Sequence, residues 1–251
     1  MRIVFFGTSQ YCLPVLESLK NNFELVQVIT REDKPVGRKQ VLTPSATKIW
    51  AIKNGVHLQE TTSLEGKFDL GIVADYGRII SEKEFNLPKL GTFNIHFSKL
   101  PDLRGASPVQ QTILRGDKTA WVTIFKIEET LDTGPILDQR EFPIFPNETA
   151  GDVYTRLFQE VANYLPTLDF AKKLVPQTGT PTFCKLLKRD DGFIKEVSEL
   201  TFNKFRAMNP WPGVWTIKDG KRMKILKCHL ENEILVVDEI QFEGKSPQSY
   251  H

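Results

Sequence analysis

Apolar residues near the start of the chain recur in two different spacings. Residues 2–6 and 25–29 are short apolar runs, typical of strands buried on both faces of a sheet. Between them, residues 10–19 place three leucines at spacings near one helical face. The order strand, turn, helix, strand predicts a parallel sheet and an α/β fold.

The same alternation of periods continues to about residue 174. Further strands are expected at residues 70–74, 91–97 and 121–127. Helices are expected at residues 43–53, 108–115 and 149–173, with Pro44 tolerated in the first turn of the first of them. Residues 1–174 are therefore predicted to form one large α/β domain.

The character of the chain changes after residue 174. A polar stretch containing Pro176, Gly179 and Pro181 follows, and we expect a linker over residues 175–197. Beyond it, the pattern predicts a helix at residues 198–208 and strands at residues 214–217, 223–226 and 234–237. Residues 198–251 are thus expected to form a small β module, near the lower size limit for independent stability.

Charge and composition narrow the class of protein. The formal net charge is +2, yet residues 171–230 contain 13 Lys and Arg against five Asp and Glu. A basic segment of this kind suits a polyanionic partner or a merely solvated surface. The chain has no apolar run long enough to span a membrane and begins without a signal-like region, so a cytoplasmic protein is expected. Its three cysteines are widely spaced and indicate neither disulfides nor a metal pair.

One cluster of polar residues has catalytic potential. If residues 91–97 form a strand, its period of two sends Asn94 and His96 to the same face. A carboxamide donor beside an imidazole can stabilise charge that develops on an acyl oxygen. Asp132, on a separate loop, can orient the imidazole or manage a proton. A lone histidine would be read as a satisfied core residue, but the three residues together favour a catalytic site.

Two other site types are disfavoured. Residues 7–12 lack the G-x-G-x-x-G pattern, which argues against a nicotinamide dinucleotide. The histidines show no paired ligand spacing, so no metal is expected.

After Arg104 and Gly105, a helix is expected to begin near Ser107 and Pro108. Its N-terminus could attract an anion, or it could be an ordinary capped helix start.

The motif residues resemble those of the folate-dependent formyltransferases. The resemblance rests on Asn94-x-His96, residues 98–101, Arg104-Gly105 and residues 131–136, and it covers most of the chain. It implies a Rossmann-like catalytic domain, a small C-terminal module like a shortened β-barrel of OB type, and 10-formyltetrahydrofolate as co-substrate without a metal. It assigns catalysis to Asn94, His96 and Asp132. It assigns folate binding to Tyr76, Gly77, Ser98, Leu100, Pro101, Arg104 and Gly105.

The acceptor is indicated by other stretches. Residues 31–38 and 43–45 resemble the loop that members acting on methionyl-tRNA place against the tRNA acceptor end, and residues 209–213 resemble the opening of their C-terminal domain. This likeness implies initiator methionyl-tRNA as partner, a role in translation initiation, and a monomer. The tRNA contacts would come from Lys34, Arg38, Lys221, Arg222 and Lys224.

Three departures from the family pattern keep other readings open. Lys99 and Asp75 stand where apolar residues are usual, and the C-terminal module is short. A shortened module suits an N-formyltransferase that acts on a nucleotide-linked amino sugar or another small amine. An RNA-binding module on an inactive formyltransferase scaffold is the non-enzymatic alternative, which the intact Asn94, His96 and Asp132 disfavour.

Overall fold

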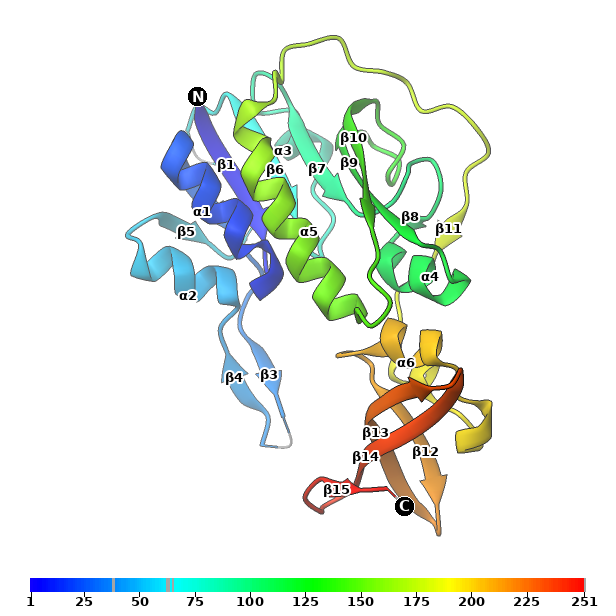
Figure 1. The fold of residues 1–251 in the computed structure, drawn as a ribbon. Coiled ribbons are helices and arrows are strands. Elements are labelled where there is room, and N and C mark those ends of the chain that lie inside the picture. The colour runs from blue at the N-terminus through cyan, green and yellow to red at the C-terminus, as the bar shows by residue number, and fades with distance from the viewer. Residues whose placement is uncertain (38, 62–63, 65, 251) are drawn as a thin grey trace. The chain divides into compact units, whose positions relative to one another are not determined.

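The computed structural model describes residues 1–37, 39–61, 64 and 66–250. The chain divides into two compact units, neither of which is continuous in sequence. The first contains residues 1–104, 121–141 and 155–181, and the second contains residues 105–120, 142–154 and 182–251. A seven-stranded sheet organises the first unit, and a four-stranded sheet organises the second (Figure 1).

The larger sheet is mostly parallel. Its seven strands are β1 (Arg2–Gly7), β2 (Glu24–Ile29), β5 (His57–Gln59), β6 (Leu70–Ala74), β7 (Thr92–His96), β9 (Thr119–Lys126) and β10 (Ile136–Pro143). They lie in the order β10-β9-β7-β6-β1-β2-β5. β1 pairs in parallel with β2 and β6, as do β2 with β5 and β6 with β7, whereas β7 and β9 are antiparallel. The predicted α/β class is confirmed.

The centre of this sheet is covered on both faces, which explains its unbroken apolar strands. In β1, Ile3 and the three residues that follow it are 0% exposed, and every residue of β6 is buried. Figure 1 shows α1 (Leu13–Asn22) and α5 (Ala150–Tyr164) over the sheet, where the Ser18 hydroxyl donates to the Ala162 carbonyl at 2.6 Å. A short 3-10 turn, η2 (Leu165–Thr167), follows α5. Burial of these strands supplies much of the unit's stability.

Two helices begin later than their sequence patterns predict. The helix expected at residues 10–19 is a 3-10 turn, η1 (Gln10–Cys12), followed by α1, because the Ser9 side chain accepts from the Tyr11 amide. The helix expected at residues 43–53 is α2 (Ala46–Lys53), because Ser45 caps it by accepting from the Lys48 amide. Pro44 precedes this cap, so its predicted place in the first turn is wrong. A short α3 (Glu82–Phe85) was not predicted.

A hairpin occupies the segment expected to be a charged loop after β2. It consists of β3 (Lys34–Val36) and β4 (Val41–Thr43), paired antiparallel with Lys34 opposite Thr43. All six strand residues are exposed, so neither strand has a buried face whose period the sequence would reveal.

The second unit joins short helices to a small antiparallel sheet. Its helices are α4 (Pro108–Arg115) and α6 (Phe202–Met208), which pack together, and two 3-10 turns, η3 (Arg189–Gly192) and η4 (Val197–Glu199). The predicted helix at residues 198–208 therefore begins only at Phe202, where the Thr201 side chain accepts from the Lys204 amide. A two-residue strand, β8 (Arg104–Gly105), pairs with β11 (Phe183–Cys184) inside the segment predicted to be a linker.

The four C-terminal strands follow one another as a meander. They are β12 (Val214–Lys218), β13 (Lys221–Glu231), β14 (Ile234–Phe242) and β15 (Gln248–Ser249), in that order. The turns between the first three have two residues each, all with positive φ, a conformation that matches the twist of the flanking strands. The predicted small β module is confirmed, and within the described residues it is an open sheet.

Candidate active site

The candidate site lies where parallel strands end. β1, β6 and β7 point the same way, so the residues after their carboxyl ends gather at one edge of the sheet. The Thr8 hydroxyl, just after β1, donates to the Tyr76 carbonyl, just after β6, at 2.8 Å. His96 is the last residue of β7 at the same edge. Open α/β sheets bind ligands at such an edge.

His96 and Asp132 face each other in a buried environment. His96 Nδ1 is 3.8 Å from Asp132 Oδ2, and the two side chains are 6% and 7% exposed. Asp132 comes from the loop between β9 and β10 and has a φ of +53°, in the left-handed region. The predicted pair is therefore assembled from two segments about 36 residues apart.

The other ring nitrogen determines what His96 can do. Nε2 lies 3.0 Å from the carbonyl oxygen of Leu103. A carbonyl only accepts, so Nε2 carries the hydrogen, and Nδ1 of the neutral ring is the acceptor that faces Asp132. The carboxylate also only accepts, so the Nδ1–Oδ2 contact becomes a hydrogen bond only when one group is protonated.

The electrostatic surroundings favour a neutral imidazole. Burial lowers the pKa of His96 below its ordinary value, and the Asp132 carboxylate opposes that decrease. The Phe125 ring, edge-on at 6.4 Å between centroids, adds an apolar neighbour. A neutral ring whose Nδ1 accepts is suited to take up a proton from a reacting amine.

Asn94 is the most accessible residue of β7. It is partly exposed, whereas the other four residues of the strand are buried. Asn94 lies two residues before His96, so the pleat directs both side chains to one face. Phe93, on the opposite face, packs against Phe170 with ring centroids 5.3 Å apart. The carboxamide is thus placed to donate a hydrogen bond beside the imidazole.

A tight loop after β7 supports His96. The Ser98 hydroxyl donates to the Asp102 carbonyl, and the Thr123 hydroxyl of β9 donates to the Ser98 carbonyl at 2.6 Å. Leu103, with a φ of +56°, ends the loop and presents its carbonyl to the imidazole. Ser98 was predicted to bind folate, and the structure finds its side chain 3% exposed and engaged within this loop. Thr123 and Leu103 were not anticipated from the sequence.

The predicted folate residues fall in three places. Tyr76 is 2% exposed and packs in a hydrophobic cluster with Phe6, and its carbonyl accepts from Thr8, whereas the following Gly77 is exposed. Leu100 and Pro101 line a groove of about 560 Å³ formed with β10 and residues 175–180. The three residues predicted for catalysis are not among the described residues that line this groove.

Arg104 and Gly105 have different surroundings. Arg104 Nη2 donates to the Gln177 Oε1 at 2.7 Å. Gly105 has a φ of +115°, and a Cβ there would lie 2.2 Å from the Cys184 carbonyl oxygen, so this position requires glycine. Among the residues that depart from the family pattern, Lys99 lies with its Nζ 4.2 Å from the centre of the Trp121 ring, and Asp75 is exposed with a φ of +47°.

The residues predicted to contact tRNA belong to both units. Lys34 is exposed on β3 of the first unit, and Arg38 lies outside the described residues. Lys221 and Lys224 are exposed on β13 of the second unit. Arg222 stacks its guanidinium 4.1 Å from the centre of the Trp215 ring.

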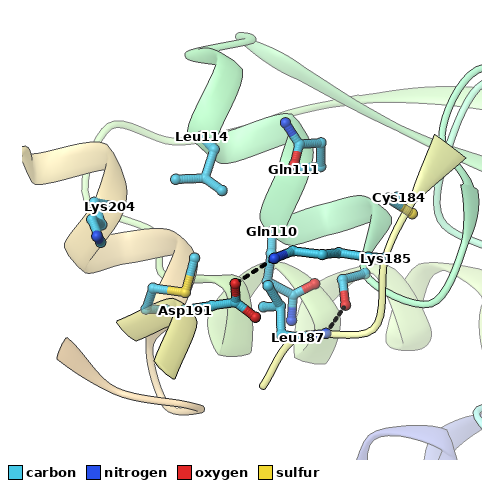
Figure 2. Close-up of a pocket in the computed structure, with 10 residues that line it drawn as sticks. Gln110, Gln111, Leu114, Cys184, Lys185, Leu187, Asp191 and Lys204 are labelled. Carbon is cyan, nitrogen blue, oxygen red and sulfur yellow. Dashed lines mark hydrogen bonds and ion pairs between the residues drawn. The ribbon is translucent and has the colours of Figure 1, made fainter. Parts of the chain in front are cut away.

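A separate cavity of about 220 Å³ lies within the second unit (Figure 2). Helices α4 and α6 and residues 184–191 line it. Lys185 Nζ and Asp191 Oδ1 neutralise each other at 2.5 Å, and the Leu187 amide donates to the Ser107 hydroxyl at 3.4 Å. The residues predicted for catalysis, folate and tRNA are not among its described lining.

The described residues offer neither a metal-binding cluster nor a membrane-spanning helix. They contain no group of three or more His, Cys, Asp and Glu side chains arranged to hold a metal ion. None of the helices in this part of the chain is both long and apolar enough to cross a membrane.

Family models and curated relatives match most of the chain. Residues 1–168 match the family model "Formyl transferase", and residues 193–234 match "Formyl transferase, C-terminal domain". The methionyl-tRNA formyltransferase of Paenarthrobacter aurescens is 36% identical, over 98% of this chain and 87% of that protein. That of Sulfurimonas denitrificans is 37% identical, over 90% and 80%.

Solved structures share the fold. Methionyl-tRNA formyltransferase from Clostridium thermocellum has a TM-score of 0.70 at 18% identity, covering 96% of this chain and 98% of that one. An N-formyltransferase from Helicobacter canadensis, solved with folinic acid and dTDP-3-aminofucose, has a TM-score of 0.66 at 24% identity, covering 96% and 92%. With matches to both family models and relatives above 30% identity along most of its length, the chain belongs to the formyl transferase family.

Proposed function

We propose that this chain transfers the formyl group of 10-formyltetrahydrofolate to the α-amine of methionyl initiator tRNA. The observation that carries the proposal is the buried His96–Asp132 pair beside the accessible Asn94, at the carboxyl edge of the sheet. The relatives at 36% and 37% identity are named for this activity. The enzyme would act in the cytoplasm at translation initiation, and as a monomer, since one chain supplies all three groups.

The reaction exchanges one carbon–nitrogen bond for another. The neutral amine attacks the formyl carbon, a tetrahedral intermediate forms, and the bond from that carbon to N10 of the folate breaks. Asn94 donates a hydrogen bond to the formyl oxygen as it gains negative charge, and loss of one such donor typically costs about 3 kcal/mol. The attacking nitrogen loses one proton to His96 Nδ1, and N10 of the departing tetrahydrofolate gains one.

The neutral state of His96 is central to this assignment. A ring held neutral by burial accepts a proton at Nδ1 without first losing one, while Leu103 keeps Nε2–H occupied. Asp132 then faces the newly charged imidazolium and stabilises it. The contact of Nε2 with Leu103 and the depressed pKa support proton acceptance as the role of His96.

The two substrates would be held by the residues that the resemblance names. For folate we propose Arg104 and the exposed Gly77, together with Tyr76, Ser98, Leu100, Pro101 and Gly105, whose contribution is to shape the loops. For tRNA we propose the basic residues of the hairpin and of β13: Lys34, Arg38, Lys221, Arg222 and Lys224. Contacts of this type bind phosphate and carry little sequence information.

The direct test is turnover. Purified protein given 10-formyltetrahydrofolate and methionyl-tRNA should yield formyl-methionyl-tRNA, measured by acid gel or mass spectrometry. His96→Ala should lose at least about 100-fold in kcat while tRNA binding is unchanged. The matched control is His57→Ala, because His57 is exposed at the edge strand β5. Full activity in His96→Ala would remove His96 from the mechanism.

A second acceptor class has structural support. The Helicobacter canadensis enzyme, solved with an amino-sugar nucleotide, shares the fold over 92% of its chain. Turnover with a nucleotide-linked amino sugar, and none with methionyl-tRNA, would replace the proposed acceptor. Binding of tRNA with no formyl transfer to either acceptor would instead identify an inactive RNA-binding scaffold.

A further inference from the structure

Gln177 is a polar residue outside the motifs that has three hydrogen bonds to the candidate site. Its Nε2 donates to the carbonyl oxygens of Asp132 and Gly134, each at 2.9 Å. Its Oε1 accepts from Arg104 Nη2 at 2.7 Å. The carbonyls only accept and the guanidinium only donates, so one orientation of the amide satisfies all three partners. Both amide hydrogens are therefore committed to the loop that carries Asp132.

The loop held by Gln177 has little other freedom. Asp132 adopts a φ of +53°, which a non-glycine residue rarely takes. Gly134 packs so closely on β9 that a Cβ would lie 1.7 Å from the Lys126 carbonyl oxygen. The Lys126 amide in turn donates to the Pro135 carbonyl at 3.0 Å. Gln177 thus holds the loop at residues 132 and 134, and β9 holds it at residues 134 and 135.

We propose that Gln177 is a positioning residue that holds the Asp132 carboxylate opposite His96 and couples this loop to Arg104. The inference rests on the proposed function and deepens it. Asp132 Oδ2 is 3.8 Å from His96 Nδ1, so a loop shift of about 1 Å changes whether a protonated His96 can interact with the Asp132 carboxylate. Misplacements of this size cost about 100-fold in rate. Gln177 acts through Asp132 and need not touch a substrate.

Three substitutions separate the contacts of Gln177. Gln177→Met keeps the side-chain length and removes every hydrogen bond. Gln177→Glu retains an acceptor for Arg104 but has no donor for the two carbonyl oxygens. Gln177→Ala removes the side chain. The matched control is Gln159→Ala, because Gln159 is exposed on α5 and bonds only locally, to Asn163 at 3.3 Å.

The proposal predicts a defect in rate more than in binding. All three Gln177 variants should lose about 10- to 100-fold in kcat, with KM for methionyl-tRNA within about threefold of the unsubstituted enzyme. Gln177→Glu should keep the folate KM nearest to normal, because Arg104 keeps its partner. Thermal unfolding by circular dichroism checks that each variant is folded. An unchanged kcat in Gln177→Met would overturn the proposal.

A second readout does not need turnover. Within the described chain Asp132 is the charged side chain that acts on His96, and it raises the His96 pKa. If the loop moves away in Gln177→Met, the His96 pKa should fall, seen by NMR titration of 13C-labelled histidine, and the His96 limb of the kcat/KM profile should move to lower pH. An unshifted His96 titration would overturn the positioning role. If no acceptor is formylated by the unsubstituted protein, the proposed function fails, and the NMR shift still decides whether Gln177 positions Asp132.

Discussion

Gly134→Ala tests whether the tight packing of the Asp132 loop sets the catalytic geometry. The added Cβ would lie 1.7 Å from the Lys126 carbonyl oxygen, in a strand of the central sheet. To reach 3.0 Å, the shortest separation that real Cβ atoms show, the loop and the strand must part by about 1.3 Å. The strand is held on its other side by β7, so the loop is the part that moves.

The size of the effect follows from that displacement. A movement of about 1.3 Å takes the 2.9 Å bonds from Gln177 beyond hydrogen-bond range and shifts Asp132 with them. Misplacement on this scale costs about 100-fold in rate, or about 2.7 kcal/mol of transition-state stabilisation. Overpacking should also lower the free energy of unfolding by about 1–3 kcal/mol. kcat should therefore fall about 100-fold in a protein that still folds.

The assay is formyl-methionyl-tRNA formation at saturating substrates, with thermal unfolding measured on the same preparation. Gly244→Ala is a contrasting control, since Gly244 has a positive φ, which Gly134 does not, and no atom within 4 Å of its added Cβ. It reports the cost of backbone strain alone. A folded Gly134→Ala variant with normal kcat would refute the reasoning, because the loop would then tolerate the displacement without catalytic consequence.

Three further predictions concern pH, the hairpin and salt. Burial depresses the pKa of His96 in the folded state, so the unfolded chain binds more protons and the free energy of unfolding should fall as pH drops below about 6.5. Urea unfolding of the unsubstituted protein at several pH values should show this decrease, and His96→Gln should make it smaller. Lys48 pairs with Asp33 at 2.8 Å and Glu60 at 2.9 Å at the base of the β3–β4 hairpin, so Lys48→Met should speed trypsin cleavage after Lys39, and unchanged cleavage would contradict a tethering role. Lys221→Ala with Lys224→Ala should weaken tRNA binding and reduce the slope of log Kd against log salt by about 1 per lost phosphate contact, whereas an unchanged slope would place these lysines away from the tRNA.

The parts of the fold that the sequence predicted are those with a buried face. β1 and β6 are recognisable because burial on both sides demands an unbroken apolar run. The β3–β4 hairpin was read as a loop because its residues are exposed on both sides and Pro35 interrupts the pattern. The predicted start of α2 was three residues early, because the Ser45 side chain, and not apolar periodicity, sets where the helix begins.

The residues of the candidate site were likewise predictable only in part. Asn94 and His96 follow from the strand period, and Asp132 follows from the motif. The Leu103 carbonyl was not predictable, because it depends on a positive φ at a residue that rarely adopts it. Gln177 was assigned to a linker, since its bonds to Asp132 span 45 residues and leave no local pattern.

The bonds from Gln177 also have a consequence for how the enzyme is made. During synthesis the strands of the sheet, His96 and Asp132 leave the ribosome before Gln177 does. A nascent chain that ends near residue 174 contains Asn94, His96 and Asp132, yet its Asp132 loop lacks the two hydrogen bonds that Gln177 donates. The site would therefore mature only when the segment after α5 folds back onto the sheet, and a fragment cut at residue 174 would lack that step however well its core had formed.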